Sequence, residues 1–172
     1  MIRVLLVLAC LAFFALCLAG MRLGWRHRAQ RQDGTGGRTD VPSALSEPLL
    51  APMTGLYVGT THAERWQDRV VARGLGVRAA MTTTLTTQGL LVERDGAEPI
   101  FIGAADLVDV GVGAGLAGKV MGPGGLLIVR WRDHAGTELD TGLRGDDKSV
   151  YPAWIDTVDR LTDHPTNHGV PS

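Results

Sequence analysis

The sequence predicts a mainly-β domain of about seven antiparallel strands that ends in one amphipathic helix and follows an N-terminal transmembrane helix. Three observations support this fold class. Residues 4–21 contain no charged side chain, and seven short runs of aliphatic and β-branched residues lie between residues 56 and 143. After these runs, apolar residues recur at helical spacing from residue 146 to residue 161.

The first apolar stretch has the length of a membrane span. A hydrocarbon core about 30 Å thick needs roughly 20 apolar residues in a helix, and residues 4–21 reach that length with Ile2, Leu23 and Trp25. We therefore predict a transmembrane anchor with its flanks over residues 1–24.

The positive residues around the span predict its orientation. Arg3 precedes the span, whereas four arginines follow it within ten residues: Arg22, Arg26, Arg28 and Arg31. Because positive residues stay on the cytoplasmic side, we expect a single-pass protein of the cell membrane with its N-terminus outside and its C-terminal domain in the cytoplasm.

A cleaved signal peptide is an alternative interpretation of the same stretch. Ala15, Cys17 and Ala19 resemble a small-x-small cleavage site, but the arginines that follow oppose export. Cys10 and Cys17 lie seven residues apart, on one face of a helix. They are therefore expected to face lipid or a packed helix and not to form a disulfide.

Composition divides the remaining chain into three parts. Residues 25–52 are predicted to be a basic juxtamembrane segment and a flexible linker, because they are rich in Gly, Pro, Gln, Asp and Ser and have no sustained period. Leu49 and Leu50 are expected to touch the domain, which covers residues 53–162. Residues 163–172 contain Pro165, Gly169 and Pro171, and we predict a disordered tail.

The strands are expected at the short apolar runs. Their ranges are 56–61, 77–86, 89–94, 99–102, 107–112, 126–131 and 138–143. Residues 87–89, 95–98 and 133–136 are predicted hairpin turns, and residues 63–73 form a short helix or a loop. The last helix starts near Tyr151 with Pro152 in its first turn, and Val150, Trp154, Val158 and Leu161 share one face.

This element order is that of a pleckstrin-homology-like (PH-like) barrel, in which a helix closes one end of two packed sheets. The runs GLYVGTT (55–61), LG (75–76), LAGKV (116–120) and ELDTG (138–142) resemble a family of actinobacterial single-pass membrane proteins with a PH-like domain. The resemblance covers the position of the anchor and residues 55–154. It implies a gene near pyrimidine-biosynthesis genes and loose labels such as transporter or export protein, and it implies no catalytic residue.

A glycine-rich motif, GAGLAGK at residues 113–119, matches both the phosphate-loop and the dinucleotide patterns. The motif lacks the Ser or Thr that should follow the lysine, since residue 120 is Val, and residues 121–125 cannot form the required helix. A flexible inter-strand loop that ends in a short strand at residues 119–121 is the favoured interpretation, with nucleotide binding as the alternative. Lys119 remains a candidate contact for an anionic headgroup.

No other motif predicts chemistry. His62, His134, His164 and His168 lack the partners of a metal site. The threonines at 82–84, 86 and 87 fit a half-exposed strand, and the acidic pairs Asp106 with Asp109 and Asp146 with Asp147 fit the starts of a strand and a helix. We therefore predict no catalytic residue, no cofactor, no metal and no enzymatic activity.

Charge argues against nucleic-acid binding. Residues 53–162 contain eleven Lys and Arg against fourteen Asp and Glu, so the domain carries a net charge of −3. If residues 63–73 are helical, Arg65, Arg69 and Arg73 lie on one face and either form a solvated surface or meet anionic lipid or an acidic partner.

The expected function is a membrane-anchored, non-enzymatic binding or scaffolding module at the cytoplasmic face of the inner membrane. Its partners are membrane lipid, through the anchor, and a protein partner or a second copy, which contacts exposed strand edges or the groove beside the Trp154 helix. An accessory subunit of a transport or export system is the alternative. The candidate membrane or partner contacts are Arg22, Arg26, Arg28, Arg31, Arg65, Arg69, Arg73 and Lys119.

Overall fold

The computed structural model describes residues 10, 12–22, 39–63, 65–116, 119–120 and 125–163. The long strands are β1 (Met53–His62), β3 (Ala79–Thr86), β4 (Gly89–Arg94), β5 (Ala97–Gly103), β6 (Leu107–Gly113), β9 (Leu126–Arg132) and β10 (Glu138–Gly145). The short elements are β2 (Arg65–Arg69), η1 (Ala72–Gly74), η2 (Ala104–Asp106), β7 (Gly115–Leu116), β8 (Lys119–Val120) and η3 (Lys148–Val150), and the domain ends in helix α2 (Tyr151–Asp163).

The seven long strands correspond to the seven predicted runs, and the mainly-β class with a C-terminal helix is confirmed. β3 and β4 form a tight hairpin with Thr87 and Gln88 at the turn, and β4 and β5 turn at Asp95 and Gly96. Gly96 has a φ of 70°, the left-handed conformation that such a two-residue turn requires. Alternation and turn chemistry therefore placed these strands correctly from local sequence.

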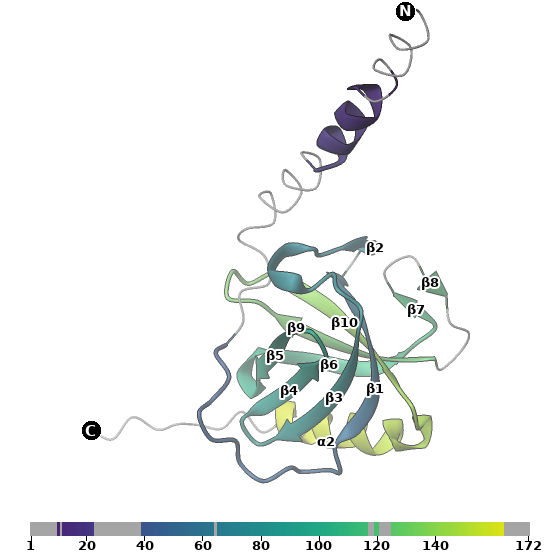
Figure 1. The fold of residues 1–172 in the computed structure, drawn as a ribbon. Coiled ribbons are helices and arrows are strands. Elements are labelled where there is room, and N and C mark those ends of the chain that lie inside the picture. Colours follow the sequence, from purple (N-terminus) through teal and green to yellow (C-terminus); the bar gives the residue numbers. More distant parts are fainter. Residues whose placement is uncertain are drawn as a thin grey trace, which may run out of the picture.

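Eight of the described strands form one antiparallel sheet, in the order β5-β4-β3-β1-β10-β9-β6 with β2 paired to β1, and β7 and β8 form a separate pair (Figure 1). The predicted closed barrel is wrong in one respect, because the two end strands, β5 and β6, do not pair and the sheet is not closed. The chain passes from β5 through η2 into β6, and helix α2 packs along β6 and contacts η2. The edge strand β6 is therefore held by side-chain packing against the helix and not by hydrogen bonds to β5.

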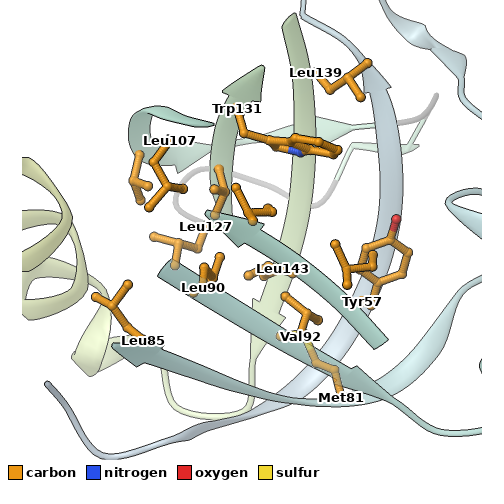
Figure 2. Packing of buried hydrophobic residues seen from close by; sticks show 14 of the residues in the cluster. Tyr57, Met81, Leu85, Leu90, Val92, Leu107, Leu127, Trp131, Leu139 and Leu143 are labelled. Atoms are coloured by element: carbon orange, nitrogen blue, oxygen red, sulfur yellow. The ribbon is translucent and has the colours of Figure 1, made fainter. Parts of the chain in front are cut away.

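The core lies between the two halves of the bent sheet. Inward residues alternate along the strands, as in Leu90 and Val92 of β4 and Ile100 and Ile102 of β5, all at most 1% exposed. Figure 2 shows Leu90 and Val92 in the same core as Trp131 of β9 and Leu143 of β10. Ile100, Ile102 and Leu139 belong to the same cluster. This core is a single cluster that every long strand joins.

Helix α2 contributes its apolar face to the same cluster. Trp154 and Val158 are buried, and Val150 and Leu161 pack against the core as predicted. Pro152 lies in the first turn, where its missing N–H costs no hydrogen bond. Asp147 caps the preceding turn by accepting a hydrogen bond from the Ser149 amide at 2.8 Å.

Residues 12–22 form a helix whose large apolar side chains are exposed: Phe13, Phe14, Leu16, Leu18 and Met21. Within the described parts of the chain, no helix combines the length and the apolarity that crossing a bilayer requires. Part of the predicted span, residues 4–9 and 11, lies outside the described residues. Arg26, Arg28, Arg31 and the predicted tail from residue 164 lie outside them too.

Residues 39–52, here called the strap, lie along the domain before β1 begins. Ser46 donates its amide to the Gln88 side chain at 2.9 Å, and its hydroxyl lies 3.0 Å from that of Thr87. The Leu49 amide donates to the Leu85 carbonyl at 2.9 Å, and Leu50 packs against the core. This part of the predicted linker is therefore docked on the domain, and the expectation for Leu49 and Leu50 is met.

Candidate functional site: an outer layer, a closed core and a groove

Three short strands form an outer layer on the sheet: β2, β7 and β8. β2 pairs with β1, β7 pairs with β8, and β2 lies beside β7 (Figure 1). The layer is held by Leu116 of β7, which packs with Val58, Leu126 and Ile128 in a small cluster separate from the main core. Gly142 makes room for it, because a Cβ there would lie 2.7 Å from Leu116 Cδ2.

The predicted glycine-rich motif therefore belongs to this outer layer. Lys119 lies opposite Leu116 in the β7–β8 pairing, within a strand and not at the start of a helix. This placement agrees with the predicted short strand and removes the helix that a phosphate loop needs. Residues 117–118 and 121–124 of the same segment lie outside the described residues.

The three domain arginines do not share a helix face. Arg65 and Arg69 belong to β2, and Arg73 lies in η1 with a φ of 51°, in the left-handed region that no α-helix contains. The chain is held extended here because the Val70 amide donates to the Thr60 carbonyl and Val70 enters the core. Arg65 and Arg73 are exposed, and the contact of β2 with β7 brings Arg65 and Arg69 to the same side of the molecule as Lys119.

Arg69 has a structural role in this layer. Its guanidinium donates to the Gly76 carbonyl at 2.8 Å and lies over Gly59, where a Cβ would come 3.3 Å from Arg69 Cζ. Arg69 therefore fastens β2 to the segment after η1. Of the three arginines, Arg65 and Arg73 are better placed to meet a partner, because both side chains are exposed.

A row of polar residues crosses the outer face of the sheet beside this layer. Thr61, Asp140, Arg130 and Asp109 are neighbours on four adjacent strands by register. Arg130 binds Asp140 through two hydrogen bonds of 2.8 and 2.9 Å, and this pairing raises the pKa of the Arg130 guanidinium. Asp140 is 10% exposed in its side chain, so the pair is fixed in the structure and does not offer a free charge.

The interior of the sheet is closed at the end where β1 meets η1. Val70, Ala72 and Leu75, here called the plug, belong to the main core cluster, and Leu75 is 0% exposed. Arg94 holds the plug from the opposite hairpin by donating to the Gly74 carbonyl at 2.7 Å. Its guanidinium also lies 4.8 Å from the centre of the Tyr57 ring.

A directional chain of buried hydrogen bonds ties the plug to the sheet. Tyr57 has one hydroxyl proton and donates it to the Leu75 carbonyl at 2.7 Å, so the Thr60 hydroxyl must donate to Tyr57 at 2.8 Å. By the same logic Thr141 donates to Thr60 at 2.8 Å, and Trp131 Nε1 donates to Thr141 at 2.9 Å. Each hydroxyl accepts once and donates once, which satisfies these groups without water.

A groove of about 380 Å³ lies between the end of the strap and the last turns of α2. Apolar side chains form much of its lining, and Arg160 and two threonines supply the polar groups. Arg160 donates to Thr157 at 3.1 Å and to the Asp156 carbonyl at 3.0 Å. The residues that line the groove are Leu49, Leu50, Thr87, Thr157, Arg160 and Leu161.

The other candidate residues are dispersed. Asp106 accepts a hydrogen bond from Thr39, and the exposed Asp109 lies on β6, so the two carboxylates do not share one partner. His62 ends β1 and His134 lies in the β9–β10 turn; in the described ranges no three metal-ligating side chains converge. His164 and His168 lie outside those ranges.

Sequence reasoning missed two groups of residues. Arg94 follows Leu90 and Val92 at the period of two that points inward, so strand alternation marks it as an inward arginine. The strap contacts carry no such signal: the Thr39 hydroxyl donates to Asp106 at 2.9 Å and lies 3.4 Å from His134 Nε2. These partners are 67 and 95 residues away along the chain.

Comparison with known proteins gives one family. The family model described as "Bacterial PH domain-like" matches residues 35–159, from just before the strap to the last turns of α2. No curated protein matches the sequence. Among solved structures, a chain from "The 8S snRNP Assembly Intermediate" is similar with 13% identity and a TM-score of 0.49, over 79% of this chain and 97% of that one.

Proposed function

This chain belongs to the bacterial PH domain-like family, and we propose that it acts as a membrane-anchored binding or scaffolding module without enzymatic activity. The observation that carries the proposal is the filled interior: the plug and the inward residues of every long strand form one core cluster. A ligand therefore meets this domain at its surface, and the surface offers a groove beside α2, the exposed Arg65 of the outer layer and the exposed Arg73 of η1.

Anchoring rests on the N-terminal residues. The uncharged stretch at residues 4–21 is followed by Arg22, Arg26, Arg28 and Arg31, and the helical residues 12–22 expose large apolar side chains. The anchor then contacts lipid, and the excess of arginines on its C-terminal side keeps the domain cytoplasmic. Paired reporters fused after residue 172 test this orientation, because only a reporter that works inside the cell should be active.

The second part of the proposal is a protein partner or a second copy of the chain, and no nucleic acid, since the domain is net acidic. Affinity capture of the tagged protein from detergent-solubilised membranes should recover the partner. Recovery of the tagged chain alone, from cells that express an untagged copy as well, would count against it.

Two matched substitutions identify the surface that the partner uses. Leu49→Asn changes the groove, where Leu49 is 39% exposed, and Arg65→Glu changes the outer layer. Val77→Asn and Arg144→Glu are the controls, because both side chains are exposed and neither belongs to the groove or the outer layer. Capture should fall several-fold for one member of the first pair and stay unchanged for both controls.

An accessory subunit of a transport or export system is the alternative, and one feature favours it. Ala12, Ala15 and Ala19 recur at helical spacing in the described helix, and Gly20 follows, so another membrane helix can pack closely there. Replacing residues 4–21 with an unrelated apolar span separates the two functions. An accessory subunit loses activity in this exchange, whereas a module that needs only a tether keeps it.

We propose further that the chain is one of the actinobacterial single-pass proteins with a PH-like domain whose genes lie near pyrimidine-biosynthesis genes. The runs at residues 55–61 and 138–142 support this narrower assignment. The genes beside the coding sequence test it, and neighbours unrelated to pyrimidine synthesis would contradict it.

A further inference from the structure

The strap decides where the membrane tether joins the domain. Thr39 is fixed by its hydroxyl, which donates to Asp106 Oδ2 at 2.9 Å and lies 3.4 Å from His134 Nε2. The contact is close-packed, since a Cβ on Gly103 would come 3.1 Å from Asp106 Oδ2 and 3.5 Å from Thr39 Oγ1. We call the surface formed by Thr39, η2 and the β9–β10 turn the tether corner.

From this geometry we propose that the domain presents its tether corner to the lipid surface. The inference rests on the proposed membrane anchoring and adds which side of the domain faces the bilayer. Exposed residues at this corner are Asp40, Ala105, His134, Ala135 and Gly136.

Covalent length supports the assignment. Sixteen residues, 23–38, separate the end of the described helix from Thr39, and they span at most about 55 Å when fully extended. Attachment at the start of β1 would instead leave thirty residues, up to about 105 Å. A domain of this size is about 35 Å across, so the shorter connection restrains it much more strongly and does so at one corner.

The opposite end of the domain is defined by β10. The β9–β10 turn precedes Glu138, the first residue of this strand, whereas its last residue, Gly145, donates its amide to the Tyr151 hydroxyl at the start of α2. Eight residues of strand separate the two ends by about 23 Å. The start of α2 therefore lies far from the tether corner.

Charge does not explain the orientation. At the corner, Arg132 is paired with Glu138 at 2.8 Å, and Asp40 and Asp106 add negative charge. An anionic bilayer does not attract such a surface, so the covalent tether must hold it there. The orientation should therefore survive high ionic strength, which screens surface electrostatics.

The test uses the full chain with Cys10 and Cys17 replaced by serine and one new cysteine that carries a fluorophore. Ala135→Cys labels the tether corner, and Ala153→Cys labels the first turn of α2; both alanine side chains are exposed. The labelled proteins are reconstituted into vesicles of phosphatidylcholine and phosphatidylglycerol that contain a lipid with a nitroxide headgroup. Flotation with the vesicles is measured first, and it tests the anchoring alone.

Among floated proteins, the fluorophore at residue 135 should be quenched at least about twofold more than the one at residue 153, because β10 keeps the two ends apart. The proposed orientation is wrong, while the anchoring stands, if quenching is equal at the two positions or stronger at residue 153. The same conclusion follows if the difference disappears at high salt. Failure to float overturns the anchoring.

A matched pair of threonine substitutions tests the role of the strap. Thr39→Val removes the hydrogen bond to Asp106, and Thr54→Val removes a bond of the same kind and length, 2.9 Å, to Asp146 beyond the strap. Thr39→Val should bring the quenching ratio toward one, and Thr54→Val should leave it unchanged. If Thr39→Val also leaves the ratio unchanged, the strap does not orient the domain and the inference fails.

Discussion

Single hydroxyl groups hold the plug of this domain in place. The chain of donors from Trp131 through Thr141 and Thr60 to Tyr57 ends on the Leu75 carbonyl, and Leu75 itself is fully buried. A buried hydroxyl that loses its acceptor, as the Thr60 hydroxyl would without Tyr57, keeps the full cost of its lost hydration. The hydroxyl of Tyr57 therefore contributes more to stability than its size suggests.

Tyr57→Phe should lower the free energy of unfolding by about 1–3 kcal/mol, since it leaves the buried Thr60 hydroxyl without its acceptor and the Leu75 carbonyl with only the longer hydrogen bond from the Thr60 amide, at 3.2 Å. Urea unfolding measures this loss. Because the two residues share one hydrogen bond, Thr60→Val should lower the free energy of unfolding less when it is added to Tyr57→Phe than when it is made in the wild-type chain. Fully additive effects would show that the chain of hydrogen bonds is not coupled.

Asp147 couples stability to pH at the start of the helical segment. Hydrogen bonds from the Ser149 hydroxyl and amide lower the pKa of this exposed carboxyl below its ordinary value of 3.8. A lowered pKa in the folded state means that the carboxylate stabilises the fold above the ordinary pKa, and that this contribution is lost as the pH falls through the folded value.

Asp147→Ala should therefore unfold at a lower temperature than the wild type at neutral pH, and the gap should close as the pH falls below about 4. Thermal unfolding followed by circular dichroism across this range measures it. Asp159→Ala, at an exposed position within α2, is the control and should not reproduce the pH-dependent gap. A gap that stays constant down to acidic pH would contradict the assigned cap.

At the scale of elements, the strap belongs to the folded domain. It contributes the partly buried Leu50, the backbone hydrogen bond from Leu49 to Leu85 and the contacts of Ser46 with the β3–β4 turn. The match to the family also begins before the strap, at residue 35. Removing the strap uncovers part of the core and leaves the Leu85 carbonyl without this donor.

A chain that starts at residue 53 should be less stable than one that starts at residue 39 by about 2–4 kcal/mol, the sum expected for one partly buried leucine and a few hydrogen bonds. Urea unfolding of the two chains measures the difference. Leu50→Ala in the longer chain serves as the intermediate control, because it removes the apolar contact alone. Equal midpoints for the two chains would mean that the strap is not part of the fold.

For the whole molecule, one core implies one unfolding transition. Trp131 of β9 and Trp154 of α2 are both nearly fully buried in the same cluster, and the eight-stranded sheet runs through the entire domain. No long strand of the described domain has a core of its own, so none is expected to unfold independently.

Unfolding in urea should therefore give the same midpoint by tryptophan fluorescence and by backbone circular dichroism. Trp25→Phe and Trp66→Phe remove the two other tryptophans, so that the fluorescence reports β9 and α2 alone. Adding Trp154→Phe to that variant leaves Trp131 as the one remaining tryptophan. Its fluorescence midpoint should again coincide with the circular-dichroism midpoint of the same variant. An earlier fluorescence transition that disappears with Trp154→Phe would show that α2 detaches first.

The sequence by itself determined the elements whose signals are local. Alternating residues and turn-forming pairs located the seven long strands, and the spacing of Trp154, Val158 and Leu161 defined the face of α2. It also located Lys119 on a short strand and explained Asp147 as a cap. Each of these properties depends on neighbours within a few residues, which a pattern can report.

Only the tertiary structure decided the features that join distant segments. The docking of Thr39 on Asp106 and His134, the extended path of residues 65–69 and the unpaired edges of β5 and β6 depend on which surfaces meet after folding. A polar segment has the same composition whether it is flexible or docked on a domain. Composition therefore predicted a flexible linker up to residue 52. Contacts across 67 and 95 residues turned its last part into the strap that fixes the end of the tether.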